Sequence, residues 1–196
     1  MGKATLGERR VFSNLAYIRV TPWTSEASGP DGDTYDLTEV VADTTTVEQA
    51  ENDSNVIEHE FSSSPLYENI TLGDKTFTCE SIDLQNNVLK GLFGWTAPKD
   101  SADLTIAPVA YKQLYATVEL AFVNTEDIIL LPKVLLNSRA VIASMKTDAS
   151  RANINGTCYH AYIDTAETDM AVVAGAKDVD GTNLATLLAR VKGAKA

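Results

Sequence analysis

Alternation of hydrophobic and polar residues dominates this chain, and helix-like periodicity is confined to two short regions. Apolar-rich runs bounded by clusters of Gly, Pro, Asn, Asp and Ser predict strands. The predicted strands and extended segments are residues 15–20, 34–49, 55–61, 67–72, 76–82, 111–123, 127–131, 134–144 and 153–163. We expect residues 51–54 to separate two opposing extended segments in a hairpin region over residues 34–62. Gly73 to Lys75 predicts a tight hairpin of its own.

The clearest helix is predicted over residues 83–93. Asp83 is the candidate N-cap and Gly94 the stop signal. Its apolar positions follow a helical spacing, at Leu84, Val88, Leu89, Leu92 and Phe93. A second, amphipathic helix is expected near the C-terminus, capped by Thr182. Its apolar side comprises Leu184, Leu187, Leu188 and Val191.

The segment of residues 111–123 alternates most regularly. One set of side chains is hydrophobic apart from Lys112, and the other set is polar or aromatic apart from Ala121. That second set contains Tyr111, Gln113, Tyr115, Thr117, Glu119 and Ala121. The pattern predicts a half-buried strand with one wet or partner-facing face.

These elements predict a mainly β protein, a β-sandwich or partly closed barrel with one flanking helix and a short C-terminal helix. We expect a β domain over residues 1–165 and a C-terminal extension over residues 166–196. No apolar run approaches the roughly 20 residues that cross a bilayer, and no hydrophobic signal segment follows the N-terminal charges. Membrane insertion is therefore not expected.

Charge is distributed unevenly along the chain. Residues 20–74 contain no Lys or Arg and hold 13 of the 27 acidic residues, whereas the other residues carry 14 acidic and 16 basic side chains. Because strand-like hydrophobic residues interrupt the acidic run, we expect a folded acidic surface rather than a disordered tail. The net charge of −11 argues against ordinary nucleic-acid binding, which needs phosphate neutralisation.

Residues for catalysis or cofactor binding are scarce. The sequence has two histidines, His59 and His160, and no metal-binding, phosphate-binding or nucleophile-elbow motif. The predicted active-site, metal and cofactor sets are therefore empty, and no enzyme activity is expected. Cys79 and Cys158 lie in strand-like runs and are interpreted as buried free thiols, with a disulfide between them left open.

Five features follow one another between residues 44 and 95: a polar hairpin, an acidic strand, a Pro-led edge, a Gly-led strand and a helix ending in Gly. The corresponding runs are Thr46-Val47-Glu48-Gln49-Ala50-Glu51, Val56-Ile57-Glu58-His59-Glu60-Phe61, Pro65-Leu66-Tyr67-Glu68, Gly73-Asp74-Lys75-Thr76-Phe77-Thr78 and Asp83 to Gly94. In this order of features the chain resembles the tail tube (major tail) proteins of tailed bacteriophages.

The resemblance implies homohexameric rings that stack head-to-tail into the tube of a virion tail assembled in the host cytoplasm. It also implies passage of double-stranded DNA without specific binding. The expected partners are further copies of the chain together with tape-measure, baseplate and tail-terminator proteins. Closing a barrel across subunits would remove edge strands that otherwise invite uncontrolled pairing.

Two sets of residues follow as candidate sites. An acidic lumen would repel passing DNA, and its candidates are Glu58, Glu60 and, on the opposing strand, Glu48. Contacts between rings would join the acidic segment to basic residues elsewhere through a heterologous interface. The candidates are Asp31, Asp33, Asp36, Glu51, Asp53, Arg9, Arg10, Lys133 and Arg139.

Two alternatives remain open at this point. One is the tube protein of a contractile injection or type VI-like system, which shares the architecture. The other is a monomeric β-sandwich adhesin or carbohydrate-binding module, in which aromatic side chains stack on sugar rings. Its candidate platform is Trp23, Trp95, Tyr111 and Tyr115.

Overall fold

The computed structural model describes residues 12–25, 29–37, 39–58, 65–82, 85–96, 106–108, 114–141 and 150–194. The chain divides into two compact units. Unit 1 comprises residues 1–38, 116–133 and 160–196, and unit 2 comprises residues 39–115 and 134–159. These units do not coincide with the expected domains 1–165 and 166–196, and that expected boundary stays a prediction.

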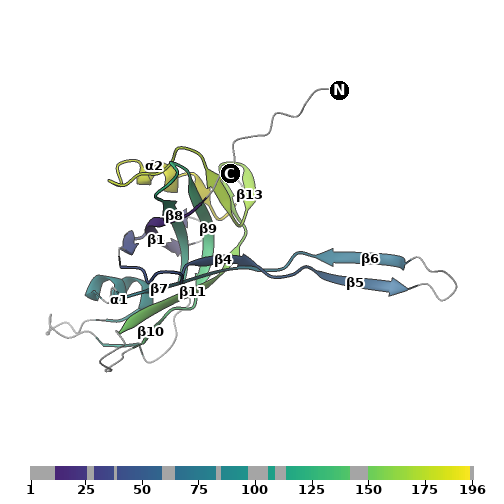
Figure 1. The fold of residues 1–196 in the computed structure, drawn as a ribbon, viewed down its shortest axis with the longest axis horizontal. Helices are drawn as coiled ribbons and strands as arrows, with labels where there is room; N and C mark the ends of the chain where they lie inside the picture. The colour runs from purple at the N-terminus through teal and green to yellow at the C-terminus, as the bar shows by residue number, and fades with distance from the viewer. Residues whose placement is uncertain are drawn as a thin grey trace. The chain divides into compact units, whose positions relative to one another are not determined.

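Unit 1 is built mainly from antiparallel strands (Figure 1). Its long strands follow the order β2-β1-β8-β9, with β3 on β1 and β14 on β9, and a small sheet has the order β13-β12-β15. The bounds are β1 Leu15–Ser25, β2 Gly29–Pro30, β3 Tyr35–Leu37, β8 Leu114–Phe122, β9 Ile128–Leu136, β12 Ala161–Ile163, β13 Ala166–Thr168, β14 Ala171–Val173, β15 Val191–Lys192 and helix α2 Leu184–Leu188. Both β8 and β9 continue into unit 2 at one end.

Strand β8 corrects one expectation from the sequence. The predicted wet face is buried, because Thr117, Glu119 and Ala121 are each 3% exposed or less. The alternate residues Val118 and Leu120 are buried as well. Both faces of β8 within unit 1 are therefore covered, and the polar side chains on one face are held by hydrogen bonds rather than by water.

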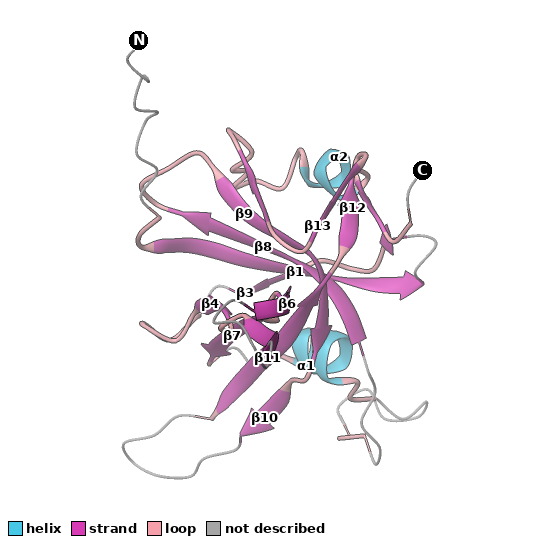
Figure 2. Cartoon of the chain, turned by 90° about the vertical axis from the view of Figure 1, so that its right-hand side faces the viewer, coloured by secondary structure: helices cyan, strands magenta, loops and turns pink. Residues whose placement is uncertain are grey.

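Unit 2 holds a second antiparallel arrangement, with the strand order β9-β11-β7-β4 and β10 beside β11. The bounds are β4 Thr46–Gln49, β5 Asp53–Glu58, β6 Pro65–Thr71, β7 Lys75–Ser81, β10 Arg139–Val141, β11 Arg151–Tyr159 and helix α1 Asn86–Phe93. Figure 2 shows how few residues of the chain are helical. The interior of unit 2 includes Phe77, Cys79, Ile154, Val134 and Leu136, each 2% exposed or less.

Strands β4 to β7 form one long hairpin, which the sequence did not predict. Strand β4 pairs with β7 and β5 with β6, so Gln49 lies opposite Lys75 and Asp53 opposite Thr71. The sum of the two residue numbers is the same in both pairs. The β5–β6 pairing therefore continues the β4–β7 pairing without a shift in register. The expected pairing of residues 34–49 with 55–61, and the expected tight turn at residues 73–75, are therefore wrong.

The helices agree with the sequence in place but not in every boundary. Gly94 ends α1 in the left-handed conformation, at φ 69°, as expected from its sequence. The N-cap is Gln85, without a side-chain capping bond, and the expected cap Asp83 lies outside the described residues. Asn183 rather than Thr182 precedes α2, and Val191 belongs to β15 instead of the helix.

The predicted mainly β fold is confirmed. Its sheets are antiparallel, as in a β-sandwich, and the described strands do not close into the expected barrel. Strand β9 also runs unbroken through Pro132, where two strands were predicted. In the described part of the chain, no helix is long and apolar enough to cross a membrane.

Candidate assembly surfaces

The outward face of β4, β7 and β11 in unit 2 carries two rows of polar side chains. In the first row Thr46 lies opposite Thr78, which lies opposite Asn155. The Oγ1 atoms of Thr46 and Thr78 are 2.8 Å apart, within hydrogen-bond distance. We call this surface, together with the second row below, the hydroxyl–amide face.

The second row contains the only charge of the hydroxyl–amide face. Glu48 lies opposite Thr76, which lies opposite Thr157. Both Glu48 and Thr76 are exposed. The two rows thus present hydroxyl groups, one amide and one carboxylate, and no cation.

A groove of about 460 Å³ runs over this face. Its lining includes Thr76, Thr78, Asn155 and Thr157, together with Asn137 from the segment after β9. The backbone amide of Asn137 donates to the carbonyl oxygen of Asn155 at 2.7 Å. This bond holds Asn137 at one side of the groove. The alternating pattern of β7 and β11 explains the arrangement, since Phe77 and Ile154 point to the buried side.

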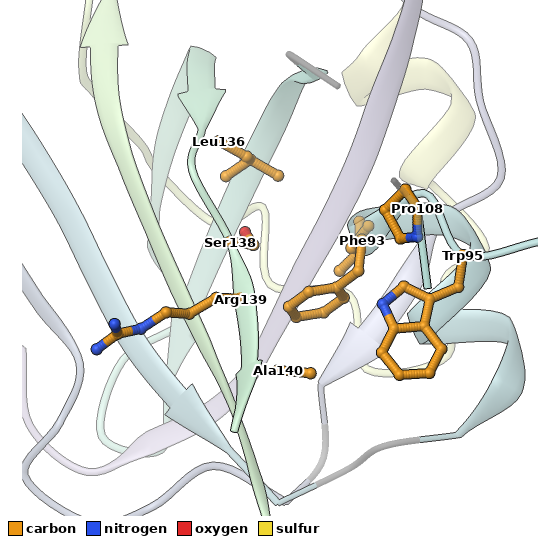
Figure 3. A pocket seen from close by; sticks show the side chains of 8 residues that line it. Phe93, Trp95, Pro108, Leu136, Ser138, Arg139 and Ala140 are labelled. Carbon is orange, nitrogen blue, oxygen red and sulfur yellow. The ribbon is translucent and has the colours of Figure 1, made fainter. Parts of the chain in front are cut away.

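A separate small hollow lies between α1 and β10 in unit 2 (Figure 3). Its volume is about 120 Å³, and it is lined by Leu92, Phe93, Trp95, Pro108, Leu136, Ser138, Arg139 and Ala140. Figure 3 shows the rings of Phe93 and Trp95 on the side of β10 toward which Ala140 points. The Arg139 side chain extends to the opposite side of the strand. We call this feature the aromatic hollow.

Unit 1 contains a buried polar cluster around Glu119. The Tyr17 hydroxyl donates to Oε1 of Glu119 at 2.6 Å and accepts from the amide of Asp178 at 2.9 Å. Arg19 donates to Asp36 at 2.8 Å and to the carbonyl oxygens of Asp178 and Val179 at 2.5 and 3.0 Å. The cluster therefore ties residues 178 and 179, far along the chain, to β1 and β8.

Burial dominates the electrostatics of this cluster. It raises the pKa of Glu119 above its ordinary value, although the Tyr17 hydrogen bond and Arg19 act in the opposite direction. Burial, with the Glu119 hydrogen bond, also raises the pKa of Tyr17 to about 12. The Oε2 atom of Glu119 is buried and has no hydrogen-bond partner. A carboxylate in that position costs stability when ionised, and the hydrogen bond from Tyr17 offsets part of that cost.

The structure separates the three candidate lumen residues. Glu48 is exposed on β4, opposite Thr76 of β7. Glu58 belongs to β5, which pairs with β6 and not with β4, so Glu48 does not lie on the strand opposite Glu58. Glu60 lies outside the described residues.

Some acidic candidates for contacts between rings already have bonding partners within the chain, and others are exposed. Asp31 accepts from the backbone amide of Thr24 at 2.9 Å and from its hydroxyl at 2.5 Å. Asp36 is paired with Arg19. Asp33 and Glu51 are exposed, and Asp53 begins β5.

The basic candidates also differ. Lys133 is 8% exposed, with its ammonium 5.5 Å from the ring centroid of Trp23, so it offers little surface to a second copy. Arg139 is exposed on β10, and Arg9 and Arg10 lie outside the described residues. Neither the hydroxyl–amide face nor the aromatic hollow was predicted from the sequence, because both depend on which strands pair.

The expected aromatic platform does not assemble as one surface. Trp23 is 7% exposed, and its Nε1 donates to the Thr117 hydroxyl at 2.8 Å, which places it in the interior of unit 1. Trp95 lines the aromatic hollow, and Tyr111 lies outside the described residues. Tyr115 instead packs edge-to-face against Tyr159, with ring centroids 6.0 Å apart.

Cys79 and Cys158 are both buried free thiols. Cys79 lies opposite Ile154, four residues from Cys158 along β11, or about 13 Å at the usual strand rise. That separation rules out the disulfide left open by the sequence. Burial also raises the pKa of Cys79 to about 12, so its thiol is unreactive near neutral pH.

Comparisons with known proteins give little further guidance. No protein-family model matches the chain, and no curated protein does. Among solved structures, a chain of the "Cryo-EM structure of the anti-feeding prophage (AFP) baseplate, 6-fold symmetrised" is similar, with a TM-score of 0.42 and 7% sequence identity. The match covers 87% of this chain and 99% of that chain. A likeness this weak does not assign a function.

Proposed function

We propose that this protein is the structural subunit of a phage-type tail tube, assembled as six-membered rings that stack head-to-tail. The observation that carries the proposal is the long hairpin. Its outer part, β5 with β6, pairs with no other strand in the described chain. The ladder can be followed in Figure 1 from β4 and β7 into β5 and β6.

An isolated two-stranded ribbon is marginally stable in water, because it buries little apolar surface and leaves both edges unpaired. This ribbon continues the β4–β7 ladder in one register, so its sequence is built to extend a sheet. Pairing with neighbouring copies would satisfy both edges. A ring of such hairpins is a closed sheet shared by several subunits, with no exposed edge left to aggregate.

The hydroxyl–amide face supports the channel part of the proposal. DNA binds proteins mainly through cations that replace its counterions. The two rows of this face contain no Lys or Arg and one exposed carboxylate, Glu48. The cation beside them on the outward side of β11, Arg151, is ion-paired with Glu80 at 2.7 Å. A channel lined by this face, with Glu58 and Glu60 as further lining residues, would let DNA slide without being held. In this proposal tape-measure, baseplate and terminator proteins meet the ends of the tube.

The same face favours a second candidate, a monomeric carbohydrate-binding module. Hydroxyl and amide groups suit hydrogen bonding to sugars, and the groove of about 460 Å³ provides room. Tyr159, which alternates with Thr157 along β11 and is 42% exposed, supplies an aromatic surface nearby. This candidate predicts a persistent monomer with saturable glycan binding.

Electron microscopy of the purified chain over a concentration series separates these candidates. We expect rings and hollow tubes with six-fold end views. A persistent monomer that binds glycans saturably would reject the tube. Tubes would remain compatible with a contractile injection or type VI-like system, because such systems share the architecture. Association of the tubes with a contractile sheath would distinguish a contractile system from a non-contractile tail.

A further inference from the structure

We propose that Leu72 of one copy inserts into the aromatic hollow of a neighbouring copy, and that this contact joins subunits in the assembly. The inference rests on the proposed tube function and names the residues of one of its contacts. It starts from the hairpin neck, which we define as residues 50–52 and 72–74. The ladder pairs stop at Gln49 and Lys75 and resume at Asp53 and Thr71.

Leu72 is 70% exposed and, with Val179 at 69%, is among the most exposed of the large hydrophobic residues whose side-chain exposure the structure describes. The neck around it is nevertheless well defined. The amide of Ala50 donates to the carbonyl oxygen of Asp74 at 2.9 Å, and the amide of Gly73 donates to Oδ1 of Asn52 at 3.3 Å. Because these bonds hold the backbone of the neck, docking Leu72 would bury apolar surface without first having to order this segment.

The aromatic hollow is large enough for one aliphatic side chain. Six of its eight lining residues are apolar, and its volume is about 120 Å³. An apolar cavity of roughly 150 Å³ accommodates benzene, so four carbon atoms of a leucine side chain fit a hollow of this size. The rings of Phe93 and Trp95 offer it flat apolar walls (Figure 3).

The charges around the two surfaces are complementary. Glu51 and Asp74 are exposed on the neck. Arg139 is exposed on β10, Lys90 is exposed in the last turn of α1, and the first turn of α1 has no acidic residue. In the proposed contact Leu72 enters on the side of the aromatic rings, and the carboxylates of the neck approach Arg139 and Lys90 nearby. Opposite charges of this kind fix orientation and raise the association rate.

The geometry also explains open-ended growth. The neck and the hollow are different surfaces of the same chain, so each copy both offers a leucine and receives one. Such a heterologous contact propagates around a ring or along a stack, whereas a two-fold contact would stop at a dimer. A second copy of this chain is therefore the occupant to which the proposal commits.

Cysteine cross-linking between two separately purified variants tests the contact. Chains carrying Leu72→Cys are mixed with chains carrying Ala140→Cys under assembly conditions and then oxidised. We expect a covalent heterodimer. A mixture in which Thr182→Cys, an exposed position in unit 1, replaces Leu72→Cys should give none. The native thiols do not interfere, because both are buried.

Two further variants give independent readouts. Leu72→Ser removes the anchor and should weaken assembly by about 10- to 100-fold, from the usual benefit of burying a leucine. Ala140→Phe fills the hollow and should block assembly while leaving the thermal transition of the monomer in place. Assembly is measured by sedimentation, and folding by circular dichroism.

The outcomes separate this inference from the proposed function. If wild-type chains form tubes but the mixed variants do not cross-link and Leu72→Ser assembles normally, the docking contact is wrong and the tube function stands. If wild-type chains form neither rings nor tubes and the mixed variants do not cross-link, both are rejected. Cross-linking together with loss of assembly in Leu72→Ser establishes the contact.

Discussion

The amide of Ala50 donates a 2.9 Å hydrogen bond to the carbonyl oxygen of Asp74. This bond lies between the β4–β7 ladder and the β5–β6 ladder and keeps them in one register. It makes four short strands into one hairpin whose arms extend over residues 46–58 and 65–81. The assembly proposal depends on that continuity, because a flexible joint here would separate the ribbon from the sheet.

The neck is sensitive to side-chain volume at Gly73. A Cβ atom built there lies 2.2 Å from the carbonyl oxygen of Ala50 and 2.7 Å from that of Glu51. Gly73→Val should therefore lower the free energy of unfolding by about 1–3 kcal/mol and reduce assembly. Equilibrium denaturation and sedimentation measure the two effects.

Gly175→Asn is a suitable control for that variant. A Cβ atom at Gly175 meets nothing within 4 Å, and asparagine tolerates the left-handed conformation found there, at φ 62°. Equal stability and equal assembly of the two variants would show that the neck does not constrain the hairpin.

Cations on the hydroxyl–amide face should convert a surface without Lys or Arg in its two rows into one that holds DNA. The double variant Thr76→Lys with Thr157→Lys adds two cations to one row of the face. We expect its tubes to bind double-stranded DNA at low salt, with an affinity that falls steeply as salt increases. Fluorescence anisotropy of labelled DNA measures the binding, and Thr76→Gln with Thr157→Gln is the neutral control. DNA binding that is equal in the two double variants would argue against this face lining the channel.

Tyr17 stabilises unit 1 through its hydroxyl group. Tyr17→Phe leaves Oε1 of the buried Glu119 without its 2.6 Å donor and the amide of Asp178 without its acceptor. We expect a loss of about 1–3 kcal/mol in the free energy of unfolding. Tyr162→Phe is the matched control, because its hydroxyl makes only an exposed 3.3 Å contact with Glu167. Similar stability of both variants would contradict the structural role of the cluster.

The raised pKa of Glu119 predicts a specific pH dependence. The folded state binds this proton more tightly than the unfolded state, so the contribution of Glu119 is fully present below pH 4.5 and is lost as the pH rises through the raised value. Glu119→Gln should flatten the fall in stability above pH 4.5. Asp164 and Asp178, whose pKa values are lowered, act below pH 3.8 and do not obscure this window.

Chemical denaturation at a series of pH values checks this prediction. An unchanged slope in Glu119→Gln between pH 4.5 and neutral pH would show that Glu119 titrates normally in the folded protein.

A charge exchange tests the electrostatic part of the contact between copies. Arg139→Glu alone should weaken assembly, because it places like charges opposite Glu51 and Asp74. Adding Glu51→Lys and Asp74→Lys should restore assembly if these groups face one another. Sedimentation of the single, double and triple variants measures the effect. Normal tubes from Arg139→Glu would remove Arg139 from the interface.

The sequence predicts strands well in this protein but not their partners. The alternation along residues 76–82 correctly indicates a strand, and Gly94 correctly ends a helix. The same alternation suits any antiparallel partner, so Glu48 was placed opposite Glu58 although it lies opposite Thr76. Long-range pairing depends on how the whole chain folds, which local periodicity does not record.

Burial of polar residues was the other feature that the sequence did not predict. Glu119 and Thr117 alternate with hydrophobic residues in β8, a pattern typical of a wet face. Their hydrogen bonds come from Tyr17 and Trp23, which lie about 100 residues earlier in the chain. Lys133 was likewise assigned to the surface, although it packs near Trp23. Each case depends on a distant partner that compensates for the loss of water.

The central claim is that the chain assembles through its long hairpin, and sedimentation velocity of a trimmed variant tests it most directly. Replacing residues 51–73 by Asn-Gly closes the β4–β7 ladder with a two-residue turn, because Ala50 and Asp74 are already bonded partners. We predict that the wild type sediments as hexamers and larger species with increasing concentration. The trimmed chain should remain a folded monomer at every concentration. Equal assembly of the two chains would contradict the account.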